Sequence, residues 1–454
     1  MGLCVGDALG VPVEFVSRES LQRDPVTGMR GYGVHNQPPG TWSDDTSMTL
    51  CLLDSLAHGL DYIDIMQRFV SWMYEGKYTP HGEVFDIGRI TKRALFRFGR
   101  GEEPLQCGGR SEFDNGNGSL MRLLPLIFIL YTRYGFPPAH VGGTSEDHEC
   151  ATNAAFDILH NVSSLTHAHA RSHLACGMYV SIASWLMIVG LPFAIDAGMT
   201  DAADYYAKKE PYAEELQHFA RICGRDSLRD FAKLPQEAIR SDGYVVHTLE
   251  AALWCLLNTD SYESCVLKAV NLGGDTDTTA AVAGGLAGLA YGPQAIPEAW
   301  KEPLARREYI EDLCENLYVA FCRHGAEKLR TYIPWLERIV APEEQQGGSE
   351  DQRNGTGISN RIEYRDLLAF MGDVYTLFLG YTPTSKIRRI TGGELQKIWS
   401  KEFIASADLE TVQSILSYFV DKERICGGIW YKAASNGTFL ALVHRLNELL
   451  LKED

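Results

Sequence analysis

Asp275-Thr276-Asp277-Thr278-Thr279 is followed by a long apolar stretch of helical period, and a similar cluster, Ser43-Asp44-Asp45-Thr46, opens another such stretch early in the chain. Each cluster therefore stands where a helix is expected to begin. Aspartate is favoured there because it accepts hydrogen bonds from the first backbone N–H groups and complements the positive end of the helix dipole. A doubled aspartate beside hydroxyl residues, occurring twice, exceeds what capping requires.

The two clusters together indicate a site for hard metal ions. Mg2+ takes oxygen ligands in near-octahedral geometry and keeps some water, so a few carboxylates and hydroxyls at a cleft suffice to hold it. Residues two apart in an established helix do not share a face, so Asp275 and Asp277 converge only where the chain turns into the helix. Gly273 and Gly274 permit that turn. Since the helix dipole opposes a bound cation, neutral replacement of the carboxylates is expected to abolish binding.

The composition is that of an ordinary soluble globular protein. The chain has 454 residues, 45% of them apolar and 22% charged, and a formal net charge of -17. That charge argues against nonspecific binding of nucleic acid or anionic lipid. No apolar run is long enough for a membrane span, and no secretory signal is evident at the N-terminus. Eleven scattered cysteines without CxxC pairs favour reduced thiols in the cytoplasm over disulfides or zinc.

The body of the chain is predicted to be mainly α-helical, because strand-like alternation is scarce and apolar residues recur in long stretches of helical period. These stretches are residues 51–74, 119–134, 153–165, 174–191 and 245–257. Glycine and proline clusters separate them, and the resulting loops are where site chemistry is expected.

A polar, glycine-rich segment without periodic apolar residues predicts a linker over residues 342–360. It divides a first domain, residues 1–341, from a small second domain, residues 361–454. The second domain has equal numbers of acidic and basic residues, so the excess negative charge belongs to the rest of the chain. Helices are predicted in it over residues 364–379, 393–403, 409–419 and 436–451, with a turn and short strand at 427–431.

Four motifs occur in a fixed order along the first 300 residues. They are Gly6-Asp7-Ala8-Leu9-Gly10 with Glu14, Trp42-Ser43-Asp44-Asp45-Thr46, Asn115-Gly116-Asn117-Gly118-Ser119-Leu120-Met121-Arg122, and Asn271-Leu272-Gly273-Gly274-Asp275-Thr276-Asp277-Thr278-Thr279-Ala280. In these motifs the chain resembles the ADP-ribosylglycohydrolase family, and most of all its bacterial dinitrogenase-reductase type. The resemblance implies an all-α, orthogonally packed helical bundle, to which this chain adds the small, mainly helical C-terminal domain.

The resemblance also implies a dinuclear Mg2+ centre, with Mn2+ as the other candidate ion. The metal ligands that it implies are Ser43, Asp44, Asp45, Asp275, Asp277 and Thr278. The implied activity is hydrolysis of the N- or O-glycosidic bond between ADP-ribose and a modified acceptor, foremost ADP-ribosyl-arginine on protein. The alternatives are a serine-linked or small-molecule conjugate as substrate, or a noncatalytic, metal-dependent ADP-ribose-binding protein. The tail domain is a candidate for binding a protein partner.

Two acidic residues match family positions with a role in proton handling. Asp114 precedes the Asn-Gly loop, and Glu14 follows the first motif. Either can serve as a general acid or base if its surroundings shift its pKa suitably, and the sequence does not choose between them. For Asp114, the competing interpretation is an Asx-turn, since aspartate is a standard turn former.

Substrate contacts are implied for the loop with two glycines and for two aromatic residues. The implied contacts are Asn115, Gly116, Asn117, Gly118, Ser119, His167 and Tyr244. In the family this loop lies along the ADP-ribose phosphates, and its N–H groups are suited to an anion. Arg122 is left out of the site, because one turn into a helix it equally suits a surface ion pair.

His167, His169 and His173 do not form a zinc site, because the i,i+2 spacing does not share a helical face and no nearby Cys or Glu completes one. The chain also departs from the family at its start, where only a few apolar residues precede the first motif. The first helix is therefore expected to be short and frayed, or else the start of the chain is truncated.

Overall fold

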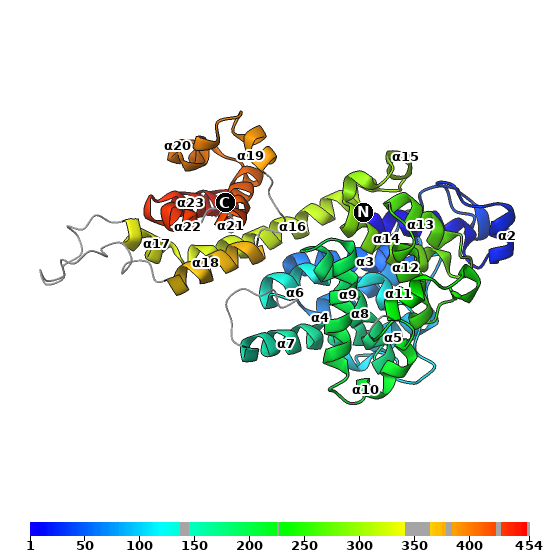
Figure 1. Ribbon diagram of the computed structural model, residues 1–454. Helices are drawn as coiled ribbons and strands as arrows, with labels where there is room; N and C mark the ends of the chain where they lie inside the picture. Colours follow the sequence, from blue (N-terminus) through cyan, green and yellow to red (C-terminus); the bar gives the residue numbers. More distant parts are fainter. Residues whose placement is uncertain (137–144, 225–226, 341–363, 378–383, 424–427, 452–454) are drawn as a thin grey trace, which may run out of the picture. The chain divides into compact units, whose positions relative to one another are not determined.

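The computed structural model describes residues 1–136, 145–224, 227–340, 364–377, 384–423 and 428–451. These residues form α-helices and short 3-10 helices joined by loops, and within those ranges the only β-structure is isolated bridges (Figure 1). The predicted all-α class is therefore confirmed. Chain contacts divide the protein into two compact units, Met1–Pro137 with Ala151–Leu317, and Pro138–Cys150 with Tyr318–Asp454. The predicted linker, residues 342–360, lies outside the described residues.

Nearly all α-helices of the first unit lie in the first 300 residues, which contain the four motifs. They are α1 (Gly2–Gly10), α2 (Arg18–Arg23), α3 (Asp44–His58), α4 (Tyr62–Glu75), α5 (Arg89–Gly99), α6 (Leu126–Tyr134), α7 (Ser145–Ser164), α8 (Ala170–Leu186), α9 (Leu191–Tyr206), α10 (Tyr212–Glu215), α11 (Ser227–Ala232), α12 (Val245–Leu257), α13 (Tyr262–Val270), α14 (Thr276–Tyr291), α15 (Glu298–Lys301) and α16 (Arg307–Arg330), of which α7 and α16 include residues of both units.

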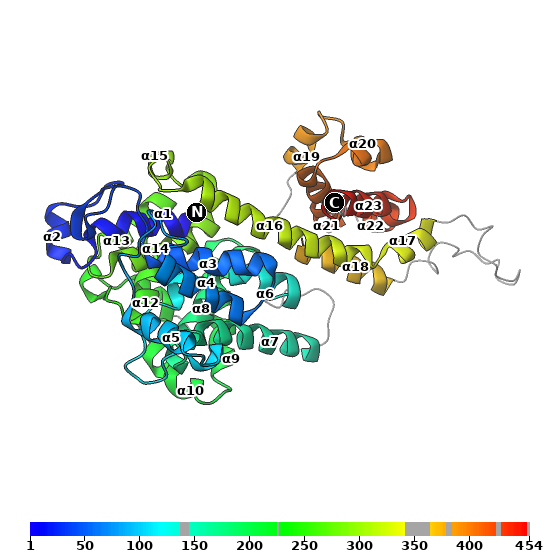
Figure 2. The same ribbon diagram turned by 180° about the vertical axis from the view of Figure 1, so that it is seen from behind.

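Helix α1 packs closely along α14 in the interior of the first unit (Figure 2). Its residues from Leu3 to Gly10 are all buried, so the expectation of a frayed first helix is wrong. Two glycines make the approach possible. A Cβ at Gly6 would lie 2.1 Å from the carbonyl oxygen of Ala280, and one at Gly10 would lie 2.3 Å from Cα of Asp277. The first motif, at Gly6–Gly10, therefore packs directly against the fourth motif, at residues 271–280.

Several predicted helices are shorter in the structure than the apolar pattern suggested. The stretch 51–74 is divided between α3 and α4, because Gly59 ends α3 and the side chain of Asp61 caps α4 by accepting from the N–H groups of Ile63 and Asp64. The stretch 119–134 is divided at Pro125, which precedes α6. The stretch 174–191 ends at Leu186, and Pro192 lies in the first turn of the next helix. In each case a local breaker overrides apolar periodicity.

The second unit is also helical. Its further helices are α17 (Ile333–Val340), α18 (Tyr364–Leu377), α19 (Thr384–Ile390), α20 (Lys401–Ser406), α21 (Leu409–Glu423), α22 (Ile429–Ser435) and α23 (Thr438–Leu450). Phe370, Phe419 and Phe439 pack together in its core, with ring centroids 5.1 and 5.4 Å apart. The strand predicted at 427–431 is wrong over its described residues, because the chain enters α22 at Ile429 after Gly428 in the left-handed region. The helix predicted over 393–403 is broken at Ser400, which caps α20.

None of the helices in the described ranges is both long enough and apolar enough to cross a membrane.

Candidate active site

The N-terminal ends of α3 and α14 meet the C-terminal half of α1, and acidic side chains from all three helices are buried there. Asp7, inside α1, accepts hydrogen bonds from the backbone N–H groups of Ser43 at 3.0 Å and Thr46 at 3.0 Å. A carboxylate from a distant helix therefore serves the orphan donors at the start of α3. This contact fixes the first metal motif against the motif at the start of the chain.

Two groups of three carboxylates have ligand atoms within 4.8 Å of one another, and Asp277 belongs to both. The first group is Asp7, Asp45 and Asp277, and the second is Glu14, Asp86 and Asp277. We call these five residues the carboxylate cluster. Of the sequence-predicted metal ligands, Asp45 and Asp277 thus come together although they lie in motifs far apart in the chain.

The remaining predicted ligands surround the cluster. The Ser43 and Thr278 hydroxyls donate to Oδ2 of Asp45 at 3.1 and 3.2 Å. Asp44 is buried and accepts from the N–H of Gly88 at 3.4 Å, and Asp275 accepts from the side-chain amide of Asn117 at 2.8 Å. These four residues therefore contact the cluster residues or lie beside them.

The protein raises the pKa of most carboxyl groups in this region. Burial is the main cause, and repulsion from neighbouring carboxylates adds to it at Asp44, Asp45 and Asp277, whose pKa values lie well above the ordinary value. Burial also raises the pKa of Asp7 to about 6, against the opposing effect of its hydrogen bonds from Thr46 and Ser43. So many buried carboxylates cannot all be ionised without protons or a cation to compensate them.

Some oxygens in this region have no hydrogen-bond partner within the described residues. They include Oδ1 of Asp45 and Oδ1 of Asp275, and both atoms are buried. A buried carboxylate oxygen without a donor is costly unless something else satisfies it. All of these ligand atoms are hard oxygens, which suit Mg2+ or Mn2+ better than zinc. The residues present therefore fit a hard divalent cation.

Glu14 lies at the edge of the carboxylate cluster, in the loop after the 3-10 helix Val11–Val13. Its Oε2 is hydrogen-bonded to Nε2 of His35. Burial is the first cause that raises the pKa of Glu14, and the charges of Asp86 and Asp275 add to it and bring the value to about 9. Without a metal ion, Glu14 is therefore protonated at neutral pH.

Asp114 has very different surroundings. Its Oδ1 pairs with Arg93, and its Oδ2 accepts from the N–H of Ser111 at 3.2 Å and from the Ser111 hydroxyl at 2.8 Å. Burial tends to raise the pKa of Asp114, but these hydrogen bonds and the Arg93 charge outweigh it and hold the pKa below its ordinary value. Asp114 thus carries a firmly held negative charge, and its carboxylate accepts from Ser111, three residues earlier, whereas an Asx-turn would take its donor from two residues later.

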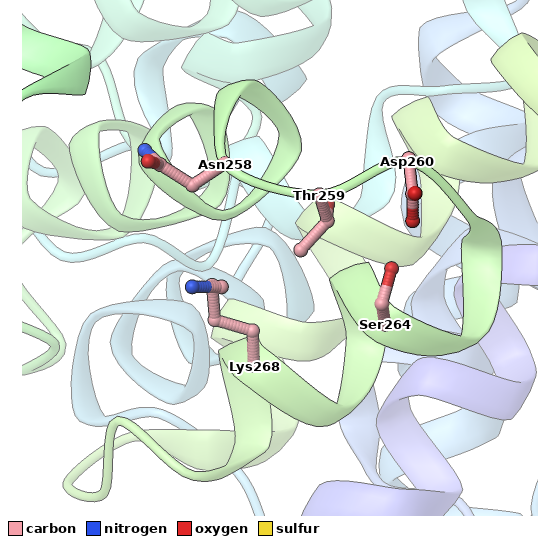
Figure 3. A pocket seen from close by; sticks show the side chains of 5 residues that line it. All are labelled: Asn258, Thr259, Asp260, Ser264 and Lys268. Atoms are coloured by element: carbon pink, nitrogen blue, oxygen red, sulfur yellow. The ribbon is translucent and has the colours of Figure 1, made fainter.

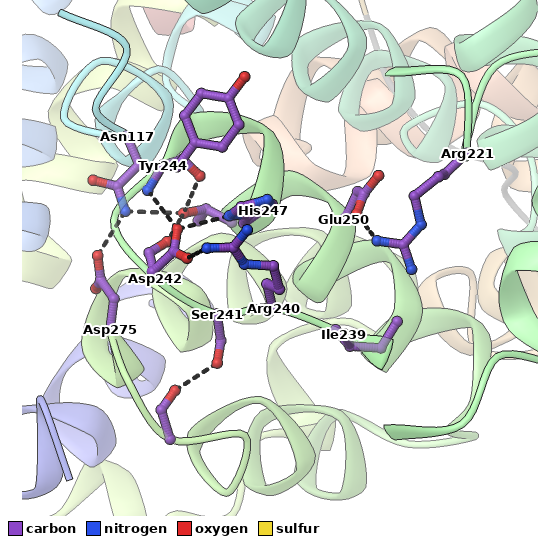
Figure 4. Close-up of polar contacts among 12 residues, drawn as sticks. Asn117, Arg221, Ile239, Arg240, Ser241, Asp242, Tyr244, His247, Glu250 and Asp275 are labelled. Carbon is purple, nitrogen blue, oxygen red and sulfur yellow. Dashed lines mark hydrogen bonds and ion pairs between the residues drawn. The ribbon is translucent and has the colours of Figure 1, made fainter. Parts of the chain in front are cut away.

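The loop from Asn115 to Ser119 is held in place by hydrogen bonds that its backbone and side chains form with other segments of the first unit. The N–H of Asn117 donates to the carbonyl of Gly243, and the carbonyl of Asn115 accepts from the N–H of Val245. The Asn117 side-chain amide donates to Asp275 and also to the Thr248 hydroxyl at 3.0 Å (Figure 4). Asn117 therefore joins the loop to the last metal motif, and its own N–H is already used.

The other predicted residues of this loop lie around it. Asn115 Oδ1 accepts from the Ser172 hydroxyl at 3.1 Å, and the Ser119 hydroxyl lies 3.4 Å from the sulfur of Cys176. Gly116 forms an isolated bridge with Tyr244. Space is tight at Gly118, where an added Cβ would lie 2.9 Å from the imidazole ring of His167.

Arg122 corrects one prediction. It does not form a surface ion pair but is fully buried, donating to the carbonyls of Gly118 and Val162, at 2.5 and 3.3 Å, with its guanidinium 5.0 Å from the ring centroid of Phe69. Burial lowers the pKa of Arg122 to about 10, so the side chain remains a cation. Arg122 therefore places a buried positive charge against the Asn115–Ser119 loop, at Gly118.

Both predicted aromatic contacts lie next to the loop, His167 at Gly118 and Tyr244 at Gly116. His167 is buried and bonded through Nδ1 to the Thr166 hydroxyl at 2.8 Å, and burial, aided by the Arg122 charge, lowers its pKa to about 3. Tyr244 is partly exposed, and the Arg171 guanidinium lies 5.9 Å from its ring centroid. His167 is therefore neutral at physiological pH and contacts the loop glycines directly.

A hollow of about 520 Å³ lies elsewhere in the first unit, where α12 ends and α13 begins (Figure 3). Its lining residues are Asn258, Thr259, Asp260, Ser264 and Lys268. None of them belongs to the carboxylate cluster or to the loop, so this hollow is not part of the candidate site.

Three residues of the site were missed from the sequence. Asp7 interrupts an otherwise apolar helix, and since a buried polar side chain must find partners, that interruption was a usable signal. Asp86 lies in a loop and His35 at the end of the 3-10 helix Gly33–His35, and both reach the cluster only through tertiary packing. No sequence signal for these two residues stands out.

Comparisons with known proteins agree with this geometry. Residues 1–327 match the family model described as ADP-ribosylglycohydrolase. The chain belongs to the ADP-ribosylglycohydrolase family. Members of this family are hydrolytic enzymes that act on ADP-ribosyl conjugates and depend on a metal, so this ADP-ribosylglycohydrolase is an enzyme with residues suited to a metal.

The chain is 30% identical over 335 residues to the ADP-ribosylarginine hydrolase Tri1 of Serratia proteamaculans, covering 70% of this chain and 77% of that protein. It is 31% identical over 315 residues to the ADP-ribosyl-[dinitrogen reductase] glycohydrolase of Rhodospirillum rubrum, covering 67% of this chain and 88% of that protein. A solved structure of an ADP-ribosylglycohydrolase-related protein complex matches with a TM-score of 0.50 and 32% identity, covering 70% of this chain and 94% of that one.

The C-terminal part of this glycohydrolase has a separate match. Residues 324–452 match a family of unknown function, DUF6508. The protein thus joins the glycohydrolase region to a second region that belongs to a different family.

Proposed function

We propose that this glycohydrolase removes ADP-ribose from ADP-ribosyl-arginine on protein, with two Mg2+ or Mn2+ ions at the carboxylate cluster. The observation that carries the metal part is that buried carboxylates gather around Asp277, which belongs to both triads: Asp45 is the other proposed ligand among them, and Asp7, Glu14 and Asp86 lie next to these two. The similarity to the ADP-ribosylarginine hydrolase Tri1 and to the dinitrogen reductase glycohydrolase supports the arginine acceptor.

The proposed ligands are the oxygens of Ser43, Asp44, Asp45, Asp275, Asp277 and Thr278. Oδ1 of Asp45 and Oδ1 of Asp275 support this assignment, since they are buried and have no other partner within the described residues. When bound, a divalent cation supplies orientation of the ribose hydroxyls and stabilises the charge that develops as the glycosidic bond breaks. Asp7 holds the start of α3 through its hydrogen bonds, and so keeps Ser43 in place.

Glu14 is the proposed general acid or base, and Asp114 a residue that shapes the loop. Glu14 carries a proton at neutral pH in the metal-free protein, and His35 holds its Oε2 in one orientation. As the bond from the anomeric carbon to the guanidine nitrogen breaks, the carboxyl proton can pass to that nitrogen; the water oxygen that bonds to the anomeric carbon loses a proton, which returns to the carboxylate of Glu14. Asp114 is instead committed to Ser111 and Arg93, and its lowered pKa makes it a poor proton donor.

The Asn115–Ser119 loop, His167 and Tyr244 are the proposed contacts to the ADP-ribosyl group. A Cβ at Gly118 would lie 2.9 Å from the His167 ring, so the loop packs closely on His167 and a glycine is needed there. Arg122 places a buried positive charge behind this loop, which favours an anionic group there despite the net charge of -17. We place the protein in the cytoplasm, in keeping with the free, mostly buried cysteines of the described residues.

The deciding experiment measures release of ADP-ribose from an arginine-modified protein and from a serine-modified peptide, each with Mg2+ and with EDTA. The parent is compared with the Asp275→Ala/Asp277→Ala double variant. Mg2+-dependent release from the arginine substrate alone, lost in the double variant, is the expected result. Release from the serine peptide alone would change the acceptor. Metal-dependent binding of ADP-ribose without release from either substrate would instead favour a noncatalytic binding protein.

A further inference from the structure

Arg18 is the first residue of α2, and its side chain reaches three backbone carbonyls more than 200 positions away in the sequence. Nε donates to Leu272 at 2.7 Å, Nη1 to Gln236 at 2.6 Å, and Nη2 to Ile239 at 2.7 Å. No ion pair joins Arg18 to a carboxylate within the described ranges. The planar guanidinium fork is therefore used to join backbone segments.

The carbonyls that Arg18 contacts belong to the two segments that hold Asp275. One segment runs from Gln236 to Ser241, whose carbonyl accepts from the N–H of Asp275 at 2.8 Å and whose hydroxyl donates to the carbonyl of Gly273 at 2.7 Å. Figure 4 draws Ile239, Ser241 and Asp275 along this path. The other segment is Leu272 to Asp275 itself. Arg18 thus joins both segments at the point where they approach each other.

The glycines of the second segment need such a support. Gly273 and Gly274 both have φ of +75°, which gives the chain its sharp turn into α14 but also the greatest freedom to leave it. The turn is packed directly on the chain around Arg18, because a Cβ at Gly273 would lie 2.7 Å from the backbone nitrogen of Arg18. The N–H of Gly274 also donates to the carbonyl of Val16 at 3.0 Å.

We propose that Arg18 is a positioning residue of the metal site, which fixes the turn before α14 and thereby aims the unpartnered Oδ1 of Asp275 at the cation. This inference rests on the proposed function, since it takes Asp275 as a metal ligand. Residues that orient metal ligands from outside the coordination sphere commonly change metal affinity by about 10- to 100-fold when replaced. Arg18 acts in this way through backbone, without contact to substrate or metal.

The test uses the full-length chain with Mn2+ as the probe, titrated and followed by the electron paramagnetic resonance signal of free Mn2+. Arg18→Met keeps the length of the side chain and removes all three donors. Arg23→Met is the matched control, because Arg23 lies on the same helix and bonds only within it, to Glu19 and Ser20. Thermal unfolding of each metal-free protein is measured in parallel, together with hydrogen exchange of the amides at residues 272–275.

Arg18→Met is expected to weaken Mn2+ binding by about tenfold or more and to speed exchange of the Gly274 and Asp275 amides. Arg23→Met is expected to behave like the parent in both measurements. Arg18→Lys keeps the charge but not the fork, and it should recover only part of the affinity. Should Arg18→Met fail to fold, Arg18→Lys carries the same test on its own.

The inference is overturned if an Arg18 variant unfolds at a lower temperature but binds Mn2+ within twofold of the parent. Arg18 would then stabilise the fold without affecting the affinity for metal. A parent protein that binds no Mn2+ would overturn the proposed metal site, and this inference with it. The two failures are distinguishable, because the first leaves the metal site of the parent intact.

Discussion

The side-chain amide of Asn117 lies 2.8 Å from Oδ2 of Asp275, although the two residues are 158 positions apart. The same amide donates to the Thr248 hydroxyl, so both of its hydrogens have partners. With Oδ2 held by Asn117, the other oxygen of Asp275 is left buried and without a partner in the described chain. The contact leaves one carboxylate oxygen committed to the loop and one available to a cation.

Replacing Asn117 with alanine is expected to weaken Mn2+ binding by about 10- to 100-fold, because Asp275 loses the donor that orients it. The measurement is an isothermal titration of the metal-free protein with Mn2+. Asn161→Ala is a suitable control, since the Asn161 amide donates to the Tyr62 hydroxyl and touches no carboxylate of the cluster. Equal affinities in the Asn117 variant and the parent would show that Asp275 needs no help from the loop.

Glu14→Gln and Asp114→Asn separate the two candidates for proton handling. Glu14→Gln is expected to lower kcat by about 10²- to 10⁴-fold, the usual contribution of a general acid or base, with little change in KM. Asp114→Asn keeps the shape of the loop but weakens its contact with Arg93, so it should affect KM more than kcat. Steady-state kinetics on the ADP-ribosyl-arginine substrate provide the measurement. The opposite pattern would assign the proton to Asp114.

The sequence predicted the parts of the site that depend on local chain geometry. Gly273 and Gly274 turn the chain in the left-handed region, as the pattern indicated. Asp275 lies near enough to Asp277 for its charge to add to burial in raising the pKa of Asp277, while their shared role as metal ligands stays a prediction. Residues that depend on distant packing were not predictable in this way. Arg122 looked like a surface residue because its local spacing is helical, and only the tertiary structure buries it.

Helix boundaries show the same division between local and tertiary effects. Apolar periodicity identified the helical regions, but it predicted one helix where α3 and α4 are separate. Gly59 is a residue that typically ends a helix and Asp61 one that typically caps the start of the next, so the break was predictable from the sequence. The roles assigned to the site residues stay predictions, since geometry shows which side chains meet and the experiments above show what they do.

Asp45→Asn is expected to stabilise the metal-free protein while removing its response to metal. Burial is the main cause that raises the pKa of Asp45, and neighbouring carboxylates add to it, so a neutral isostere removes both the cost of burying a charge and that repulsion. A gain of about 1 kcal/mol would raise the thermal midpoint by roughly 2 to 4 °C. Added Mn2+ should raise the midpoint of the parent and leave that of the variant unchanged.

Asp54→Asn is the control for this experiment, and it is expected to shift the thermal midpoint in the opposite direction. Asp54 pairs with Arg68 and accepts from the Tyr78 hydroxyl at 2.6 Å, so its replacement should lower the thermal midpoint and preserve the metal response. A metal-free Asp45→Asn protein less stable than the parent would mean that repulsion in the carboxylate cluster is already relieved.

A buried network of two histidines predicts how stability depends on pH. Tyr206 donates to the carbonyl of His173, so its oxygen must accept from Nε2 of His160 at 2.9 Å. Nδ1 of His160 then accepts from the Tyr212 hydroxyl, whose oxygen accepts from Nδ1 of His173, both at 3.2 Å. Nε2 of His173 accepts from Ser164 at 2.9 Å. With both imidazoles neutral every proton has an acceptor, and no acceptor is left for an added proton.

Burial accordingly lowers the pKa of His173 to about 3 and that of His160 well below its ordinary value of 6.5. The unfolded chain therefore binds more protons than the folded one below pH 6.5. The stabilising contribution of these histidines is fully present above that pH and is lost as the pH falls further. Between pH 6.5 and 4.5 the loss from His173 alone is about 2 kcal/mol, from 1.36 kcal/mol per pH unit and a group half protonated in the unfolded chain at pH 6.5.

Urea unfolding of the metal-free protein at several pH values between 8 and 4.5 measures this loss. The cluster carboxylates titrate over the same range, and their raised pKa values act with the opposite sign, since protons bound only in the folded state stabilise it as the pH falls. The difference between the parent and His173→Gln isolates the histidine. Glutamine does not titrate, so the variant should be less stable than the parent at pH 8, and the gap should narrow or reverse at pH 4.5. A gap independent of pH would mean that His173 has the same pKa in the folded and unfolded protein, and so is not buried in the neutral form as described.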